Sequence, residues 1–220
     1  MRQQVVASWS GGKDSCLSLA LAQDSGMMVS HLLNILNEDG VTSCTHGLSS
    51  ELMRAQAKAL GLPLIQLVTN GFRYEADFKR CLNELKTQGV DGGVFGNGDV
   101  DRQWIDCVCR EAGMSAHLPL EGMTKDRILK EFISRGFEAI VVTTRANVMS
   151  EEWLGRKLDA DFLKAWDNVR REKNISRAAE AGAYHTTVLG GPLFQKTLKI
   201  VESKKVLDDG FWYLNILKVE

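Results

Sequence analysis

The residues best suited to chemistry are the six from Ser10 to Ser15, which read Ser-Gly-Gly-Lys-Asp-Ser. They follow an apolar run at 5–7 and open a helical pattern at 16–22. A strand, a glycine turn and a helix in this order direct several backbone N–H groups and the positive helix end toward one place, where an anion can bind. The two glycines let a phosphate approach the backbone closely. The segment therefore predicts a phosphate site, whose expected contacts are Ser8, Ser10, Gly11, Gly12, Lys13 and Ser15.

Two common phosphate motifs do not describe this segment. The NTPase P-loop requires a glycine where Ala7 stands and a serine or threonine where Asp14 follows Lys13, and no Gly-x-Gly-x-x-Gly fingerprint is present. An anionic Asp14 would repel phosphate, so we expect it either to hold a Mg²⁺ that bridges phosphate oxygens or to cap the helix, and capping is favoured. The alternative for the whole segment is an ordinary glycine turn capped by Ser10, with Lys13 in solvent.

Short apolar runs alternate with amphipathic helical patterns through the first half of the chain, as in βαβ units. Expected strands lie at 5–7, 29–36, 63–68 and 93–96, and expected helices at 51–60, 74–88 and 104–112. Gly61, Gly89 and Gly113 follow these three helices and predict their ends. The alternation predicts an α/β fold with a parallel sheet covered by helices on both faces.

The second half has a different pattern. Helices are expected at 126–134 and 159–171, and strands at 139–144, 186–189, 197–201 and 212–216, with the last three close together and antiparallel. We place a boundary near residue 120, which gives an N-terminal domain at 1–120 and a smaller α+β domain at 121–220. Docked at the carboxyl ends of the parallel strands, the second domain would cover the nucleotide site.

The composition is that of a globular protein, with 220 residues, 44% of them hydrophobic and 25% charged. The net charge of −1 argues against a general nucleic-acid binder. No apolar run is long enough to cross a bilayer. Five irregularly spaced cysteines do not suggest a disulfide framework, so the cytoplasm is the expected location. A homodimer is expected because enzymes of this size commonly pair.

A second motif stands at 180–194 and reads Glu-Ala-Gly-Ala-Tyr-His-Thr at its start. With the segment at Ser10, it resembles the diphthine–ammonia ligase family, whose N-terminal part is an N-type ATP pyrophosphatase of the PP-loop (HUP, adenine nucleotide alpha hydrolase-like) class. The resemblance extends over nearly the whole chain through His46, the Gln-Ala-x-Ala-Leu-Gly-x-Pro-Leu pattern within 52–64, Val94-Phe95-Gly96 with Gly98-Asp99-Val100, and Trp-Leu-Gly-Arg at 153–156.

The resemblance implies an ATP-dependent ligase that releases AMP and pyrophosphate, with ATP and Mg²⁺ as cofactors. A carboxylate attacks the α phosphate, and ammonia then attacks the acyl-adenylate. It adds His46 and Gly96 to the nucleotide contacts, names Lys13, Glu180 and His185 as catalytic, and names Asp99, Gly182, Tyr184 and Thr186 as substrate-binding. Asp14 would be the metal ligand. Glu180 and His185 would orient the amine or take its proton. Other interpretations remain open: His46 as a packed surface residue, Asp99 as a turn residue, Glu180 as a helix end and His185 as a strand start.

Four departures from the family pattern concern the acceptor side, at Ala179, Ala183, Gly190 and Glu121. The resemblance implies a carboxylate acceptor, with a modified protein histidine as one candidate. If the missing Glu and Asp contact the substrate in the family, the acceptor here is expected to be something other than diphthine. Two alternatives stay open: the same adenylation chemistry on a small-molecule acid or a tRNA base, and a nucleotide sensor without turnover. The basic run at 170–177 is interpreted as a solvated helix end, or as an attraction for an anionic macromolecule.

Overall fold

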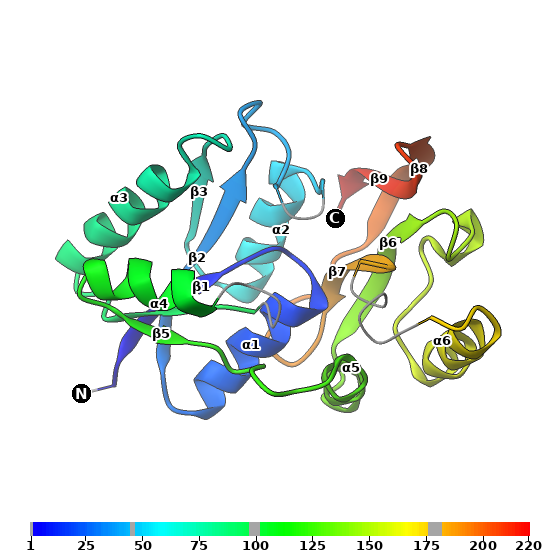
Figure 1. The fold of residues 1–220 in the computed structure, drawn as a ribbon, viewed down its shortest axis with the longest axis horizontal. Coiled ribbons are helices and arrows are strands. Elements are labelled where there is room, and N and C mark those ends of the chain that lie inside the picture. The colour runs from blue at the N-terminus through cyan, green and yellow to red at the C-terminus, as the bar shows by residue number, and fades with distance from the viewer. Residues whose placement is uncertain (1, 45–46, 97–101, 176–181) are drawn as a thin grey trace.

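The computed structural model describes residues 2–44, 47–96, 102–175 and 182–220, and these residues form two sheets (Figure 1). The first sheet is parallel, in the order β3-β2-β1-β4-β5, with β1 at Gln4–Ser8, β2 at Met28–Leu36, β3 at Leu64–Val68, β4 at Gly92–Val94 and β5 at Ser115–His117. The second is antiparallel, in the order β7-β6-β9-β8, with β6 at Glu138–Arg145, β7 at Tyr184–Gly190, β8 at Ile200–Asp208 and β9 at Phe211–Val219.

The helices are α1 (Lys13–Asp24), α2 (Ser50–Leu60), α3 (Tyr74–Thr87), α4 (Arg102–Glu111), α5 (Lys125–Ser134) and α6 (Ala160–Glu172), with a short 3₁₀ turn η1 at Glu151–Trp153. Their ends follow local chemistry. Ser49 caps α2 by accepting a hydrogen bond from the Leu52 N–H at 3.2 Å, and Gly61 ends it with a left-handed φ of 69°. Asp159, expected as the first residue of α6, is its cap and accepts from the Phe162 N–H at 2.8 Å.

Alternation along β1 divides the parallel sheet into two faces. Val5 and Ala7 pack into the core that α1 and α2 share, whereas Val6 packs with α3 and α4. Figure 1 shows these helix pairs on opposite faces of the sheet, so the expected α/β fold is confirmed. The strand order reverses between β1 and β4, and loops at the carboxyl ends of two such strands border the crevice where ligands of open parallel sheets bind.

Helix α1 lies between the two halves of the molecule. Leu17 and Leu19 on α1 belong to the same buried cluster as Phe132 of α5, Trp166 of α6 and Val188 of β7. The antiparallel sheet is therefore docked on the parallel half through one continuous apolar core, with β7 beside the start of α1 (Figure 1). Among the described residues, no helix has both the length and the apolar character needed to span a bilayer.

One strand prediction was wrong, and one strand was missed. The strand expected at 197–201 runs instead from Ile200 to Asp208, where four consecutive polar residues, 202–205, occupy the exposed edge of the sheet. Edge strands carry such charged residues without loss of pairing, and they hide the apolar pattern on which the prediction depended. Strand β5 was not predicted, because Ser115–His117 has no apolar run and exists through its pairing with β4.

Candidate functional site

The turn after β1 has the shape of an anion site. Gly11 has a φ of +77°, and a Cβ there would lie 2.5 Å from Met53 Cε and 2.7 Å from Gln56 Oε1, so only glycine fits. Gly12 is the N-cap of α1, so the N–H groups of the first helical turn, which have no partner inside the helix, begin at this point. Ser8 is the last residue of β1, paired with Leu33.

The two serine hydroxyls of the turn lie together. Ser10 Oγ donates to Ser15 Oγ at 3.2 Å, and Ser15 Oγ is 3.0 Å from the Gly12 carbonyl oxygen. The Gly12 N–H reaches Ser10 Oγ at only 3.4 Å, at the limit of a hydrogen bond. The hydroxyls and this N–H group are thus gathered where a phosphate oxygen can replace a weak internal contact.

Lys13 is not in solvent, contrary to the alternative interpretation of this turn. Its side chain is 13% exposed, and its Nζ lies 3.1 Å from Asp14 Oδ2 and 5.6 Å from the ring centroid of Tyr184. The positive charge is therefore held over the turn by partners from both halves of the chain.

The favoured role of Asp14 as helix cap was wrong. Gly12 is the cap, and Asp14 lies in the first turn of α1, where the helix dipole stabilises its charge. Its second oxygen, Oδ1, is buried and has no hydrogen-bond partner within the described part of the chain. A carboxylate with one unsatisfied oxygen at an anion site suits Mg²⁺, which usually takes one or two carboxylates and completes its shell with phosphate and water. Within the same part of the chain, no three His, Cys, Asp or Glu side chains gather as a metal cluster.

Strand β7 brings the late motif to this turn. One contact between them joins residues that are 173 positions apart in sequence. Thr186 Oγ1 accepts the Lys13 N–H at 3.1 Å. Tyr184 packs edge-on against Phe162 and Trp166, with ring centroids 5.3 and 5.4 Å apart. The two segments singled out in the sequence therefore meet at the start of α1.

His185 titrates abnormally at this position. Burial and, to a lesser extent, the charge of Lys13 lower its pKa to about 4, with Asp14 partly opposing both effects. At neutral pH the imidazole is uncharged. It therefore keeps a lone pair that can accept a proton or a hydrogen bond.

The other predicted residues fall into two groups. Gly96 lies against the start of α1, where a Cβ would be 2.6 Å from Ser15 Cα, and Gly182 has a φ of +84° beside Arg145. His46, Asp99 and Glu180 lie outside the described residues. Glu121 is exposed and forms an ion pair with Arg102.

Sequence reasoning missed Gln56. It was part of a stretch quoted for its resemblance, yet no role was assigned to it. It is fully buried and its side chain joins the Gly11 carbonyl to β7. The available signal was a long polar residue between buried Met53 and Ala57 on the inward face of α2.

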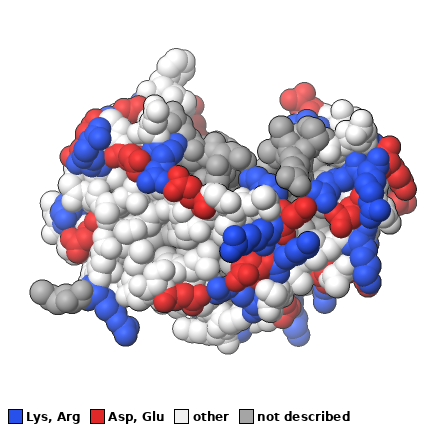
Figure 2. Space-filling model, turned by 60° about the horizontal axis from the view of Figure 1, so that its bottom comes forward, with Lys and Arg blue, Asp and Glu red and all other residues white. Residues whose placement is uncertain are grey.

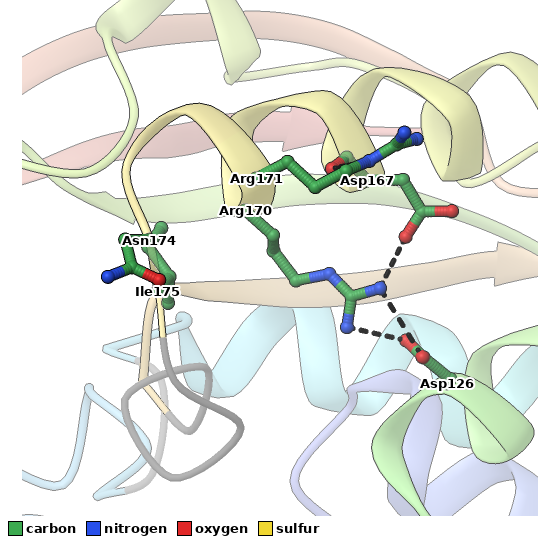
Figure 3. A pocket seen from close by; sticks show the side chains of 6 residues that line it. All are labelled: Asp126, Asp167, Arg170, Arg171, Asn174 and Ile175. Atoms are coloured by element: carbon green, nitrogen blue, oxygen red, sulfur yellow. Dashed lines mark hydrogen bonds and ion pairs between the residues drawn. The ribbon is translucent and has the colours of Figure 1, made fainter.

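Apart from the turn, a hollow with a volume of about 580 Å³ lies between α5 and α6 (Figure 3). Its lining residues are Asp126, Asp167, Arg170, Arg171, Asn174 and Ile175. Arg170 pairs with Asp126 at 3.1 Å and also with Asp167, so the described part of the basic run includes an ion-pair network. On the face in Figure 2, Lys and Arg are interspersed with Asp and Glu over this region and do not form one basic patch.

Comparison with known proteins identifies relatives over the whole chain. Residues 3–116 match the family model described as "Diphthamide synthase N-terminal domain", and residues 124–220 match "Diphthamide synthase C-terminal domain". The Danio rerio protein named "Diphthine--ammonia ligase" is 24% identical, with 98% of this chain and 94% of that protein covered. The Homo sapiens protein of the same name is 24% identical, with 93% and 85% covered.

The protein of that name from Schizosaccharomyces pombe is also 24% identical and is matched over 99% of this chain, which spans only 39% of its length. Among solved structures, the predicted subunit of tRNA methyltransferase from Methanocaldococcus jannaschii aligns over 86% of this chain and 98% of its own, with a TM-score of 0.50 and 17% identity. At that identity the likeness concerns the fold alone.

Proposed function

The chain belongs to the diphthamide synthase family, and from that membership we propose that it is an ATP-dependent ligase that converts a carboxylate to an amide with ammonia. The observation that carries the proposal is the meeting of the Ser10–Ser15 turn with β7, through the Lys13 N–H and Thr186 Oγ1 at 3.1 Å. An anion-binding turn and a motif of different chemistry are then in direct contact. Such an arrangement suits a reaction between a nucleotide and a second substrate.

The reaction needs two displacements. A carboxylate oxygen of the acceptor attacks the α phosphorus of ATP, and the bond to the β phosphate breaks to release pyrophosphate. Ammonia then attacks the acyl carbon, the bond to the AMP oxygen breaks, and the extra proton of the amine is lost. Negative charge builds on the leaving pyrophosphate in the first step. Fixed donors must therefore meet it there.

The residues at the turn fit this requirement. Lys13 supplies a positive charge that is already held in place, and the Ser10 and Ser15 hydroxyls with the Gly12 N–H supply donors. We assign Asp14 Oδ1 to Mg²⁺, which would neutralise charge on the phosphate oxygens when bound. Catalysis of the first step then consists mainly of positioning and charge stabilisation.

We assign the second step to His185 and to Glu180. With its pKa lowered to about 4, His185 is uncharged at neutral pH and can accept a hydrogen bond from the attacking amine. A base this weak holds a full proton poorly, so its part is to orient the amine. The nearby negative charge of bound ATP would raise its pKa and strengthen that interaction.

A second candidate is the same chemistry on a different carboxylate. Ala183 and Gly190 stand where the family has acidic residues, and the first is completely buried. A carboxylate other than diphthine is the acceptor that this difference favours. We place either reaction in the cytoplasm, since the five thiols are free and a reducing compartment keeps them so.

Product analysis tests the proposal. The purified protein is incubated with ATP, Mg²⁺ and ammonium, with and without candidate carboxylates, and the nucleotide products are separated. AMP and pyrophosphate that depend on one carboxylate, together with its amide, are expected. Release of ADP and phosphate would overturn the assignment of α-phosphate chemistry. Tight ATP binding with no turnover on any acceptor, diphthine-bearing protein included, would favour a nucleotide sensor.

A further inference from the structure

We propose that Gln56 is a positioning residue that fixes the orientation of the Gly11–Gly12 peptide, and so makes the phosphate turn depend on β7. The inference rests on the proposed function, because it concerns the binding of the pyrophosphate part of ATP at that turn. Gln56 itself need not touch the nucleotide. It acts through the backbone of the turn.

The amide of Gln56 is completely buried and fully used. Its Nε2 donates to the Val188 carbonyl at 2.7 Å and lies 3.1 Å from both the Gly11 carbonyl and Thr187 Oγ1. Its Oε1 accepts from Trp9 Nε1 at 2.9 Å. An indole N–H can only donate, so Oε1 must face Trp9 and the NH₂ group must face the two carbonyls. The direction of the amide is therefore set by chemistry.

The Gly11 carbonyl is held from the second half of the chain. It accepts from Gln56 Nε2, from the Val188 N–H at 2.9 Å and from Thr187 Oγ1 at 3.4 Å. In a planar trans peptide the C=O and the N–H point in opposite directions. Anchoring the Gly11 oxygen therefore turns the Gly12 N–H toward Ser10, on the side of the turn that carries the two serine hydroxyls.

Without Gln56 the Gly11 carbonyl keeps the Val188 N–H and Thr187 Oγ1 but loses its Nε2 donor, so the peptide would be held less firmly. Glycine on both sides of a peptide permits many backbone conformations, so the Gly12 N–H would spend less time directed at the anion. The Val188 carbonyl and the Trp9 indole N–H would also lose a partner in a buried place. Because β7 also carries Tyr184 and Thr186, the same amide connects the phosphate turn to the acceptor side.

The test replaces Gln56 by methionine, which has similar volume but cannot donate these hydrogen bonds. The matched control is Gln66→Met, since Gln66 Nε2 also donates to a backbone carbonyl, that of Ser50 at 3.1 Å, which is the first residue of α2 and not part of the Ser10–Ser15 turn. Calorimetry measures the Kd for Mg²⁺-ATP and for inorganic pyrophosphate, and thermal unfolding is followed in the same buffers. We expect Gln56→Met to raise both Kd values by roughly tenfold or more, as for the loss of one or two hydrogen bonds, while Gln66→Met changes them by less than about twofold even where its Tm falls equally.

A spectroscopic readout separates positioning from general destabilisation. With 5-fluorotryptophan incorporated, the ¹⁹F resonance of Trp9, assigned by Trp9→Phe, is expected to shift on addition of pyrophosphate. In Gln56→Met that shift is expected to be lost. Should Gln56→Met not fold, Gln56→Leu takes its place, because leucine also fills the buried space with an apolar side chain and cannot donate to the carbonyls.

Two results are distinguished from each other. A folded Gln56 variant that binds pyrophosphate as tightly as the unaltered protein would overturn the positioning role. An unaltered protein that binds neither ATP nor pyrophosphate would instead overturn the proposed function, since the anion site itself would then be wrong.

Discussion

The Ser10–Ser15 turn (the phosphate turn) contacts strand β7, and we call the part of the site formed by residues 182–190 the acceptor side. Hydrogen bonds hold the turn in place, whereas packing fills the acceptor side. The turn is held by hydrogen bonds: Gly11 accepts from Gln56 and Val188, and the Lys13 N–H is taken by Thr186. Around the acceptor side, two positions that are acidic in the family are filled by packing. Ala183 is fully buried, and a Cβ on Gly190 would lie 2.6 Å from Thr197 Oγ1.

The difference teaches how each of the two regions should respond to substitution. Polar contacts at the turn come from both halves of the chain, so a change at any of them disturbs the others. Ala183 is fully buried, and Thr197 occupies the space beside Gly190. Nucleotide chemistry is thus expected to persist while the acceptor preference differs, and a single substitution at Ala183 or Gly190 is not expected to restore the family's acidic side chain without cost.

Lys13→Ala tests the nucleotide side and is expected to have the largest effect. Removing a fixed charge from a developing anion lowers turnover on the order of 10²–10³-fold, and ATP binding should weaken as well. Stability should fall only modestly, since the lysine makes one ion pair with Asp14 and one cation–π contact with Tyr184. Steady-state kinetics and calorimetry give both numbers. Lys130→Ala, on the exposed side of α5, is the control. Normal ATP affinity in Lys13→Ala would remove this residue from the phosphate site.

Ala183→Glu tests whether the acceptor side is closed by packing. Ala183 has no exposed surface, so the new carboxylate would be buried and the free energy of unfolding should fall by about 3 kcal/mol or more. Ala183→Gln adds nearly the same volume without the charge, so it separates the loss of stability caused by volume from that caused by charge. Urea unfolding at pH 7 and pH 5 measures both, and Ala183→Glu should recover part of its loss at pH 5, where the acid can be neutral. A stable Ala183→Glu protein with increased turnover would mean that this position does face the acceptor.

His185 lies between the two sides and gives a pH-dependent prediction. In the unfolded chain its pKa is about 6.5, and in the folded protein it is about 4. Above pH 6.5 neither form binds the proton. As the pH falls toward 4, the unfolded chain takes up a proton that the folded one refuses, so stability is lost, by at most about 3 kcal/mol.

His185→Gln removes this proton and should therefore lose less stability over the same range. Urea unfolding at several pH values between 7 and 4 compares the two proteins, and shared effects of other groups cancel in the difference. Curves that stay parallel would show that His185 is not held uncharged. In the Lys13→Ala background, the difference in pH-dependent stability loss between the protein that keeps His185 and the His185→Gln variant should become smaller, because the lysine charge contributes to lowering the pKa of His185.

Most of the fold could be predicted because its signals are local. The apolar runs of β1 and β2 and the glycine after α2 are visible in short windows of sequence, and so is the Ser10–Ser15 turn. The failures concern residues whose role is set by distant partners. Asp14 was expected to cap a helix that Gly12 caps, and β5 depends entirely on β4.

The same reasoning explains Gln56. Nothing near it in sequence indicates that it contacts Gly11 and Val188, which are 45 and 132 residues away. The site was thus predicted as two separate motifs, and the side chain that joins them could be found only in three dimensions. Polar residues on the buried face of a helix are the positions at which sequence reasoning most needs a structure.

Gly190→Asp is the gentlest test of the acceptor side and should have the smallest effect. Thr197 is exposed and can move, so we expect a cost of only about 1 kcal/mol. Thr197→Ala should remove most of that cost, because two of the three closest atoms to the new Cβ are the Oγ1 and Cγ2 of Thr197. Urea unfolding of the single and double variants forms a cycle in which the two substitutions couple favourably. If the two losses of stability are additive, the cost of Gly190→Asp does not come from contact with Thr197 and must come from the backbone at position 190. Packing would then not be what keeps this position small, in contrast to our interpretation of the acceptor side.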